Sequence, residues 1–401
     1  MKKKPTRRAA LHASAGLALA STLHAEQPMK KPNVYEALGI KPVINAAGTF
    51  TALGGSVMPP EVVAAWVEAA KHFVDLPLLQ DKVGAKIAQL IGVEAAMVTT
   101  GAAGSMLLGC AAAVTRGDKK LIPRLPDTTG MKNEVLIQKS HHSCYDNQFT
   151  DVGIKFVDVE TAADVEKHIS DRTALMFFMN HAGPTGKIHL AQWVELARKF
   201  KIPSLLDAAA DVPPLSRLTE YTKMGFDMVA FSGGKAIRGP NDAGLLLGRK
   251  DLIEAAKLNA NPHCGTIGRM MKVGKEDMVA MLAAVERFVA LDHDAEWKEF
   301  ERRLTVIENS VKGIHSIVCE RIVPAIANHV PHTQITWDES KVKTTPAKVT
   351  KLLAEGDPQI RIGRVAGTGD KGILISVLTL QEGEDRIVAE RLAAILKKAA
   401  E

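Results

Sequence analysis

The chain has 401 residues, of which 46% are hydrophobic and 24% are charged, as in ordinary globular proteins. A chain of this length buries enough core to need no disulfide or metal, and its four cysteines are too widely spaced to indicate either. The formal net charge is +6, but five positive charges lie in the first eight residues; the rest, at about +1, lacks the basic surface that nucleic acid binding requires.

Residues 1–25 predict a bacterial export signal. A basic start and a twin arginine, Arg7 and Arg8, precede a weakly apolar Ala/Leu stretch that ends near Ala25. This order is typical of twin-arginine signals, and the stretch is too short to span a bilayer. We therefore expect a periplasmic protein that is exported in the folded state. The alternative is a basic N-terminus without a signal, which would leave the protein in the cytoplasm.

The next segment, residues 26–75, is rich in turns and leads into a helix near Pro60. Apolar residues at helical spacing predict helices over residues 60–74 and 78–92. Seven apolar runs of strand length follow in a large domain over residues 76–275: EAAMVTT, VLIQ, IKFVDV, ALMFFM, PSLLDA, MVAFSGG and AGLLLG. Several of these runs are apolar on both faces, which is typical of buried parallel strands joined by crossover helices.

Residues 276–401 differ in pattern from the large domain. A long amphipathic stretch over residues 276–314 predicts one or two helices. Three short strands (HTQITWD, QIRIGRV and GILISVL) and a closing helix follow. The expected fold is α/β, with a seven-stranded and mostly parallel sheet in the large domain and a small C-terminal α+β domain.

Lys235 and Asp207 each follow an apolar strand. The carboxyl ends of parallel strands meet at one edge of a sheet, where ligands bind, so we expect the two side chains to share a site. Ser232 and the two glycines before Lys235 would let a ligand approach the backbone closely. This setting favours a reactive lysine over a surface lysine.

Two further strand ends add binding groups. VTTGAAGSM joins a strand to a helix through small residues, so free N–H groups of the helix start would hold an anion. QKSHHSCYD supplies a flat ring from His141 or His142. An anion cradle, a stacking ring, an acid and a reactive lysine are the four parts that hold pyridoxal phosphate. A zinc site from the two histidines and Cys144 lacks a further ligand at usable spacing, so no metal is expected.

The chain resembles the pyridoxal-phosphate enzymes of the aspartate-aminotransferase fold, in the selenocysteine-synthase-like branch. That branch holds the L-seryl-tRNA(Sec) selenium transferases and the D-glucosaminate-6-phosphate ammonia-lyases. The matching stretches run from about Ile44 to Leu282 and are INAAGTFTALGGSVMPPEV, GAKIAQLIGVEAAMVTTGAAG, QKSHHSCYD, LLDAAAD, FSGGKAIRGPNDAGLLLG and IGRMMKVGKEDMVAML. The lyase-like group is the more similar of the two.

The resemblance implies a role for each candidate residue. Lys235 would form the Schiff base with the cofactor, and Asp207 would pair with the pyridinium nitrogen. His141 would stack on the ring. The phosphate would be held by the backbone N–H groups of three residues, helped by a hydroxyl: Gly101, Ala102, Ala103 and Ser232.

Four basic residues are candidates for substrate binding. Arg269 and Lys272 lie at the head of a predicted helix, where they are either solvated or reach an active site across a dimer interface, as the family implies. Arg361 and Arg364 are three apart on one strand, so only one of them can point at a substrate carboxylate, which arginine binds well.

The expected activity is that of a lyase. We predict α,β-elimination from an amino acid or amino-sugar acid, giving a 2-oxo acid and ammonia, in a homodimer or higher homo-oligomer. Other outcomes on the same cofactor remain open, among them selenium transfer, racemisation and aldol cleavage. The hypothesis from another class is a non-catalytic exported binding protein, against which the intact Lys235 and Asp207 argue.

Overall fold

The computed structural model describes residues 33–363 and 372–401, so the predicted leader lies outside the described residues. The chain divides into two units, Met1–Pro42 and Val43–Glu401. The described part of the first unit holds one short 3-10 helix, η1 (Glu36–Leu38), which Gly39 ends in the left-handed conformation at φ 75°. None of the helices in the described ranges is long and apolar enough to cross a membrane.

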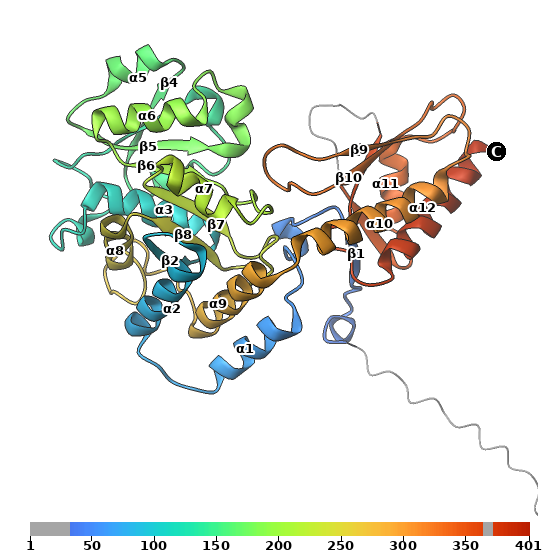
Figure 1. Ribbon diagram of the computed structural model, residues 1–401, viewed down its shortest axis with the longest axis horizontal. Helices are drawn as coiled ribbons and strands as arrows, with labels where there is room; N and C mark the ends of the chain where they lie inside the picture. The colour runs from blue at the N-terminus through green and yellow to red at the C-terminus, as the bar shows by residue number, and fades with distance from the viewer. Residues whose placement is uncertain (1–32, 364–371) are drawn as a thin grey trace, which may run out of the picture. The chain divides into compact units, whose positions relative to one another are not determined.

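The second unit contains a seven-stranded sheet (Figure 1) in the order β2-β8-β7-β6-β5-β3-β4. Within this sheet only β8 runs opposite to the other strands, so the predicted seven-stranded, mostly parallel sheet is confirmed. The carboxyl ends of β6 and β7 therefore lie side by side. The strands are β2 (Ala95–Thr99), β3 (Glu134–Gln138), β4 (Lys155–Val159), β5 (Thr173–Met179), β6 (Ser204–Asp207), β7 (Met228–Ser232) and β8 (Gly244–Gly248).

Helices cover both faces of the sheet. Successive strand residues point to opposite faces, so an apolar strand contributes side chains to a core on each side. Phe177 and Phe178 of β5 are both buried, and each enters a different hydrophobic core. The core that contains Phe178 is shared with α1 (Pro60–Ala70), α2 (Leu76–Ile91), α5 (Ala162–His168), α6 (Leu190–Phe200), α7 (Arg217–Met224) and α9 (Lys275–Ala290). The core that contains Phe177 is shared with α3 (Gly101–Thr115), α4 (Asn147–Thr150) and α8 (Lys250–Leu258).

Helix α3 follows β2 and lies close to the sheet. Its sequence, GAAGSMLLGCAAAVT, is mostly small residues, and nearly all of them are buried. A Cβ atom at Gly109 would lie only 3.3 Å from the Leu205 Cδ2 atom of β6, so a larger residue there would push the helix outward. Small side chains thus bring the start of α3 to the edge where the parallel strands end.

The outer edge of β2 is closed by a side chain of α2. The Gln80 amide donates to the Val98 carbonyl at 2.7 Å, and the Val98 N–H donates back to Gln80 Oε1 at 2.9 Å. This pair of bonds imitates a neighbouring strand and fixes the end of the sheet that leads into α3.

The C-terminal part contains a three-stranded antiparallel sheet in the order β12-β10-β9 and a separate strand pair, β1 with β11. The elements are β1 (Val43–Ala46), α10 (His293–Val311), β9 (Val318–Ile322), β10 (His332–Thr336), α11 (Pro346–Ala354), β11 (Gln359–Ile362), β12 (Ile373–Ser376) and α12 (Glu384–Ala400). Strand β1 pairs parallel with β11 and adds Ile44 to the core of this part.

The long amphipathic stretch forms two helices, α9 and α10. The break lies at Asp292, whose side chain accepts a hydrogen bond from the Ala295 N–H at 2.9 Å and so caps α10. Helix α9 packs on the large sheet and α10 on the C-terminal core, so the break lets one continuous chain serve both cores.

Candidate active site

Lys235 lies in the turn that follows β7. Its side chain is half-buried, and its Nζ atom forms no hydrogen bond or ion pair with any described residue. Burial lowers the pKa of Lys235, while the charges of Asp207 and Asp211 act to raise it. The result is an amine that loses its proton more readily than a surface lysine does.

The two glycines before Lys235 are required by the chain's own packing. A Cβ atom at Gly233 would lie 2.4 Å from Met281 Sδ, and one at Gly234 would lie 2.5 Å from Asn241 Cα. The close neighbours of these two glycines are α9 and the returning loop. That the glycines also let a ligand approach the backbone stays a prediction.

Asp207 ends β6, next to β7. Its Oδ1 atom accepts the Ala209 N–H at 2.9 Å, and its other oxygen has no partner in the described part of the chain. Burial raises the pKa of Asp207, whereas the Ala209 N–H and the charge of Lys235 lower it. A half-buried carboxylate with a free oxygen fits a cationic N–H donor, as the pyridinium nitrogen of a cofactor would be.

Asp211 lies four residues further on, and sequence reasoning did not select it. It is 2% exposed, and its Oδ2 atom accepts the Tyr221 hydroxyl at 2.7 Å and the Asn180 amide at 2.5 Å. Its charge raises the pKa of both Asp207 and Lys235. The available signal was the second aspartate in LLDAAAD.

The start of α3 carries the predicted anion cradle. Gly101 opens the helix at φ 64°, and the first N–H groups of a helix have no partner within it. The hydroxyl of Thr100, just before the helix, is buried and has no hydrogen-bond partner among the described residues. Free N–H groups beside an unpaired hydroxyl fit a phosphate, held at Gly101, Ala102 and Ala103.

Ser232 is the last residue of β7 and is half-buried beside the lysine turn. Its N–H donates to the Ala209 carbonyl at 3.2 Å, so β7 is tied to the loop that follows Asp207. Its hydroxyl forms no hydrogen bond with any residue in the described ranges, which leaves it free for a ligand.

His141 lies in the described structure away from any open surface. It is 0% exposed, its ring meets Phe178 edge-on at 4.5 Å, and burial lowers its pKa to about 4. A ring with neither face accessible has no surface for a cofactor, so this placement does not support the stacking role. His142 bonds instead to Asp146 at 2.5 Å and Asp158 at 2.8 Å.

Two other rings lie near Asp207, and sequence reasoning named neither. Burial raises the pKa of Tyr145, and the charges of Cys144 and Asp207 add to the effect. The charge of His181, in turn, lowers the pKa of Asp207. Tyr145 is 48% exposed, so its ring is accessible where that of His141 is not.

The basic candidates are more scattered. Arg361 is half-buried in β11, opposite Asn45 of β1, and its guanidinium has no partner among the described residues. Arg269 and Lys272 are exposed in the loop before α9. No described hydrogen bond or ion pair joins these three to Lys235 or Asp207, and Arg364 lies outside the described residues.

The residues present fit pyridoxal phosphate. Lys235 offers an amine, Asp207 a free carboxylate oxygen, and the start of α3 with Thr100 an anion cradle. These groups all follow carboxyl ends of strands in one sheet, where the fold class binds its ligands.

Comparison with known proteins agrees with this chemistry. The chain matches the model of the aminotransferase class-V family over residues 125–277. D-glucosaminate-6-phosphate ammonia lyase of Salmonella typhimurium (strain 14028s / SGSC 2262) is 30% identical over 394 residues, which cover 92% of this chain and 100% of that protein. An L-seryl-tRNA(Sec) selenium transferase of Clostridium botulinum (strain 657 / Type Ba4) is 25% identical over 89% of this chain and 83% of that protein.

A solved structure shares the fold over almost the whole chain. The structure of D-glucosaminate-6-phosphate ammonia-lyase superposes with a TM-score of 0.81 at 28% identity, covering 93% of this chain and 100% of that one. The resemblance, the fold and the cofactor predicted from the sequence are therefore confirmed. The chain belongs to the pyridoxal-phosphate-dependent enzymes of the aspartate-aminotransferase fold, in the family that includes D-glucosaminate-6-phosphate ammonia lyase.

Proposed function

We propose that this protein is an ammonia-releasing lyase that acts on an amino acid or amino-sugar acid with a hydroxyl on the β-carbon. The observation that carries the proposal is the half-buried Lys235, without a partner in the described structure and next to the strand that ends in Asp207. The similarity over 92% of the chain to an ammonia lyase supports elimination over the other outcomes on this cofactor.

The cofactor, when bound, withdraws electrons from the carbon that carries the substrate's amino group. Lys235, whose pKa is lowered, would hold the cofactor through its amine and, once the substrate's amine has displaced it, would take the proton from that carbon. The negative charge of Asp207 would keep the pyridinium nitrogen of the cofactor protonated. Loss of the β-hydroxyl removes water, and hydrolysis then returns it, so the net products are a 2-oxo acid and ammonia.

Arg361 is the proposed ligand for the substrate's carboxylate. Its half-buried guanidinium has no partner in the described part of the chain, and arginine binds carboxylates through two parallel hydrogen bonds. The name of the lyase relative includes a phosphorylated substrate. Such a substrate fits poorly with an exported protein, so we propose an unphosphorylated substrate here.

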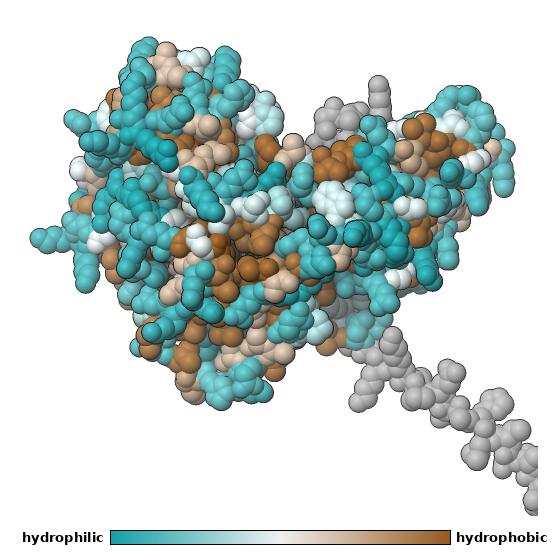
Figure 2. Space-filling view, viewed as in Figure 1, coloured by the Kyte–Doolittle hydropathy of each residue, from teal (hydrophilic) through white to brown (hydrophobic). Residues whose placement is uncertain are grey.

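We further propose a homodimer that associates through an apolar surface. Figure 2 shows hydrophobic side chains at the surface over α1 and α9. The large hydrophobic side chains that are exposed between residues 50 and 78, of which the third to fifth lie on α1, are Phe50, Val57, Val63, Trp66, Val67, Phe73, Val74 and Leu78. Phe73 is 103% exposed, and clustered exposure of this kind marks a protein interface.

A second copy at this surface would lie near the lysine turn. The Ser56 hydroxyl donates to the Gly234 carbonyl at 2.9 Å, so the segment with the apolar side chains already contacts the residue before Lys235. The exposed Arg269 and Lys272 are the groups proposed to reach the neighbouring site, and Met270 between them is 83% exposed.

We also propose that residues 1–25 export the folded protein to the periplasm. The support is in the sequence: Arg7 and Arg8 precede the weakly apolar stretch, and every proposed site residue lies far along the chain from them.

Lys235→Ala is expected to abolish the visible absorbance of the bound cofactor and to reduce turnover by roughly 10⁴-fold, because both nucleophile and base are lost. The cofactor-free variant should unfold at no lower temperature than the wild type, since a half-buried amine is removed. Borohydride reduction followed by mass spectrometry locates the attached cofactor. Lys201→Ala, an exposed lysine, is the matched control, and a cofactor adduct on any lysine other than Lys235 sinks the assignment.

Asp207→Asn is expected to retain the cofactor but to lower kcat by about a hundredfold to a thousandfold, because an amide cannot hold the cationic N–H by charge. Steady-state assay of ammonia release measures the effect. Turnover like that of the wild type would remove Asp207 from this role.

We also expect the stability of the cofactor-free protein to depend on pH through Asp207, and the Asp207→Asn variant tests this. Burial raises the folded pKa of Asp207, so the stabilisation linked to this carboxyl is complete below its ordinary pKa of about 4 and is lost as pH rises through the raised value. Asp207→Asn should lack that loss, so its advantage should grow with pH in thermal unfolding. A constant difference across this window would contradict the assigned burial effect.

Phe73→Glu is expected to weaken the dimer and lower activity, because a charge would be buried at the proposed interface. Sedimentation at micromolar concentration measures the change, and Leu352→Glu, at another exposed apolar position, is the control.

Mixing the Lys235→Ala and Arg269→Ala variants tests whether the two subunits share the site. If they do, random mixed dimers would regain up to about a quarter of wild-type activity. An active wild-type monomer would contradict the proposal.

Replacing both Arg7 and Arg8 with lysine is expected to trap the protein in the cytoplasm, because twin-arginine recognition depends on the guanidinium pair rather than on charge alone. Cell fractionation measures the distribution. A chain that starts near Glu26 should turn over as well as the full chain. Unchanged delivery of the double-lysine variant would refute the export route.

A further inference from the structure

Arg238, three residues after Lys235, has a backbone conformation that residues other than glycine rarely adopt. Its φ is 60°, in the left-handed region. Two hydrogen bonds hold the turn around the lysine: the Arg238 N–H donates to the Lys235 carbonyl at 3.0 Å, and the Gly239 N–H donates to the Gly233 carbonyl at 2.8 Å. A glycine at 238 would make the same turn without strain, so the turn alone does not explain an arginine here.

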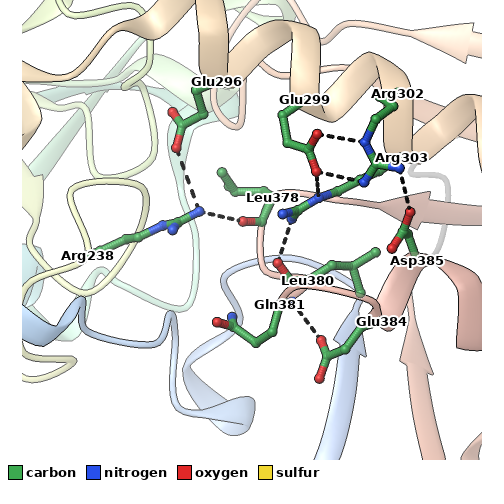
Figure 3. Close-up of polar contacts among 10 residues, drawn as sticks. All are labelled: Arg238, Glu296, Glu299, Arg302, Arg303, Leu378, Leu380, Gln381, Glu384 and Asp385. Atoms are coloured by element: carbon green, nitrogen blue, oxygen red, sulfur yellow. Dashed lines mark hydrogen bonds and ion pairs between the residues drawn. The ribbon is translucent and has the colours of Figure 1, made fainter.

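The Arg238 side chain crosses to the C-terminal part of the unit (Figure 3). Its Nη2 atom donates to the Leu378 carbonyl at 3.0 Å and lies 3.7 Å from the Glu296 carboxylate of α10. Both charged side chains are largely buried, at 22% and 19% exposed, so water competes little for these contacts. The guanidinium therefore ties the lysine turn to the segment after β12.

That segment, residues 377–381, is held from two more sides. Arg303 donates to the Leu380 carbonyl at 2.6 Å and is itself held by Glu299 at 2.8 Å, as Figure 3 shows. The Thr379 hydroxyl donates to the Asn45 carbonyl at 2.7 Å. These bonds hold the segment in one place, so it forms a fixed platform. A group that bonds to the platform, as Arg238 does, is held in place as well.

The platform leads to the proposed carboxylate ligand. Asn45 of β1 pairs directly with Arg361 of β11 in the strand register. Contacts consequently run without a gap from Lys235 through Arg238, residues 377–381 and Asn45 to Arg361. The two ends of this path are the groups that would hold the amino end and the carboxylate end of one substrate molecule.

We propose that Arg238 is a positioning residue that sets the Lys235 turn against residues 377–381, and so fixes the separation between the lysine and the carboxylate-binding strand pair. The proposal rests on the proposed function of Lys235 and Arg361. Correct spacing at both ends of a substrate contributes to the rate because misplacement of the reacting atoms is costly. Arg238 itself need touch neither substrate nor cofactor.

Arg238→Gly is the decisive variant, because glycine accepts the φ of 60° and only the side-chain link is lost. We expect kcat/KM to fall by about tenfold to a hundredfold, the range for losing a hydrogen bond from a charged donor. Arg238→Lys, which keeps the charge but not the planar fork, should recover part of this loss. Lys201→Gly is the matched control: it has φ 55° at the end of α6 and no contact with the site, and should behave as wild type.

Hydrogen exchange of the cofactor-free protein gives a readout that needs no turnover. In Arg238→Gly, peptides covering residues 233–239 and 377–381 should exchange faster together, while β3 should not change. Titration of the visible absorbance of the cofactor-bound protein should show a shifted midpoint in Arg238→Gly but not in Lys201→Gly. Should Arg238→Gly fail to fold, Glu296→Gln, which weakens the same link from α10, is expected to show the same pattern with a smaller effect.

Wild-type kinetics and unchanged exchange at both peptides in Arg238→Gly would overturn the proposal. Faster exchange throughout the protein, β3 included, would also overturn it, since that result means a general loss of stability. If the wild-type protein releases no ammonia from any substrate while exchange at the two peptides is still coupled through Arg238, the proposed function fails and the positioning role stands.

Discussion

The amine of Lys235 and the carboxylate of Asp207 are half-buried beyond the ends of two neighbouring strands, and within the described residues they have fewer partners than burial of charge normally demands. Asp211 shows the alternative within the same loop: it is almost fully buried and accepts hydrogen bonds from both Tyr221 and Asn180. Asp207 accepts one hydrogen bond, from the Ala209 N–H, and its second oxygen has no partner among residues 33–363 and 372–401. Burying charge without full compensation costs stability, so the surrounding structure has to hold these two groups in place. The deep packing of β6 and β7 and the satisfied network at Asp211 supply that support.

The large sheet was predictable because several of its strands are apolar on both faces, although β4 is not. Runs such as ALMFFM have no helical period, and burial between two helical layers explains why. Strand β9 carried no such signal, since none of the five residues of VCERI is fully buried and three of them are exposed. Strand β1 was hidden for another reason: its four residues lie in a turn-rich stretch, and its partner β11 is more than three hundred residues away.

The placement of candidate residues was predictable where it follows from a strand end, as for Lys235 and Asp207 after the neighbouring strands β7 and β6, while their roles stay predictions. It was not predictable where packing decides orientation. His141 occupies a plausible position in the motif, yet its ring turns into the core beside Phe178. For Gly233 and Gly234 the sequence did not reveal a packing requirement, because the atoms that a Cβ atom would meet belong to Met281 and Asn241. A single sequence cannot supply such contacts between distant segments.

The amide of Gln80 has a consequence for how copies of this protein can meet. An unpaired strand edge invites a strand of another molecule, and open edges of this kind seed aggregation. At Val98 of β2 this edge is not available for pairing, because Gln80 of the same chain bonds both its N–H and its carbonyl. Sheets of two copies therefore cannot merge in register across this position.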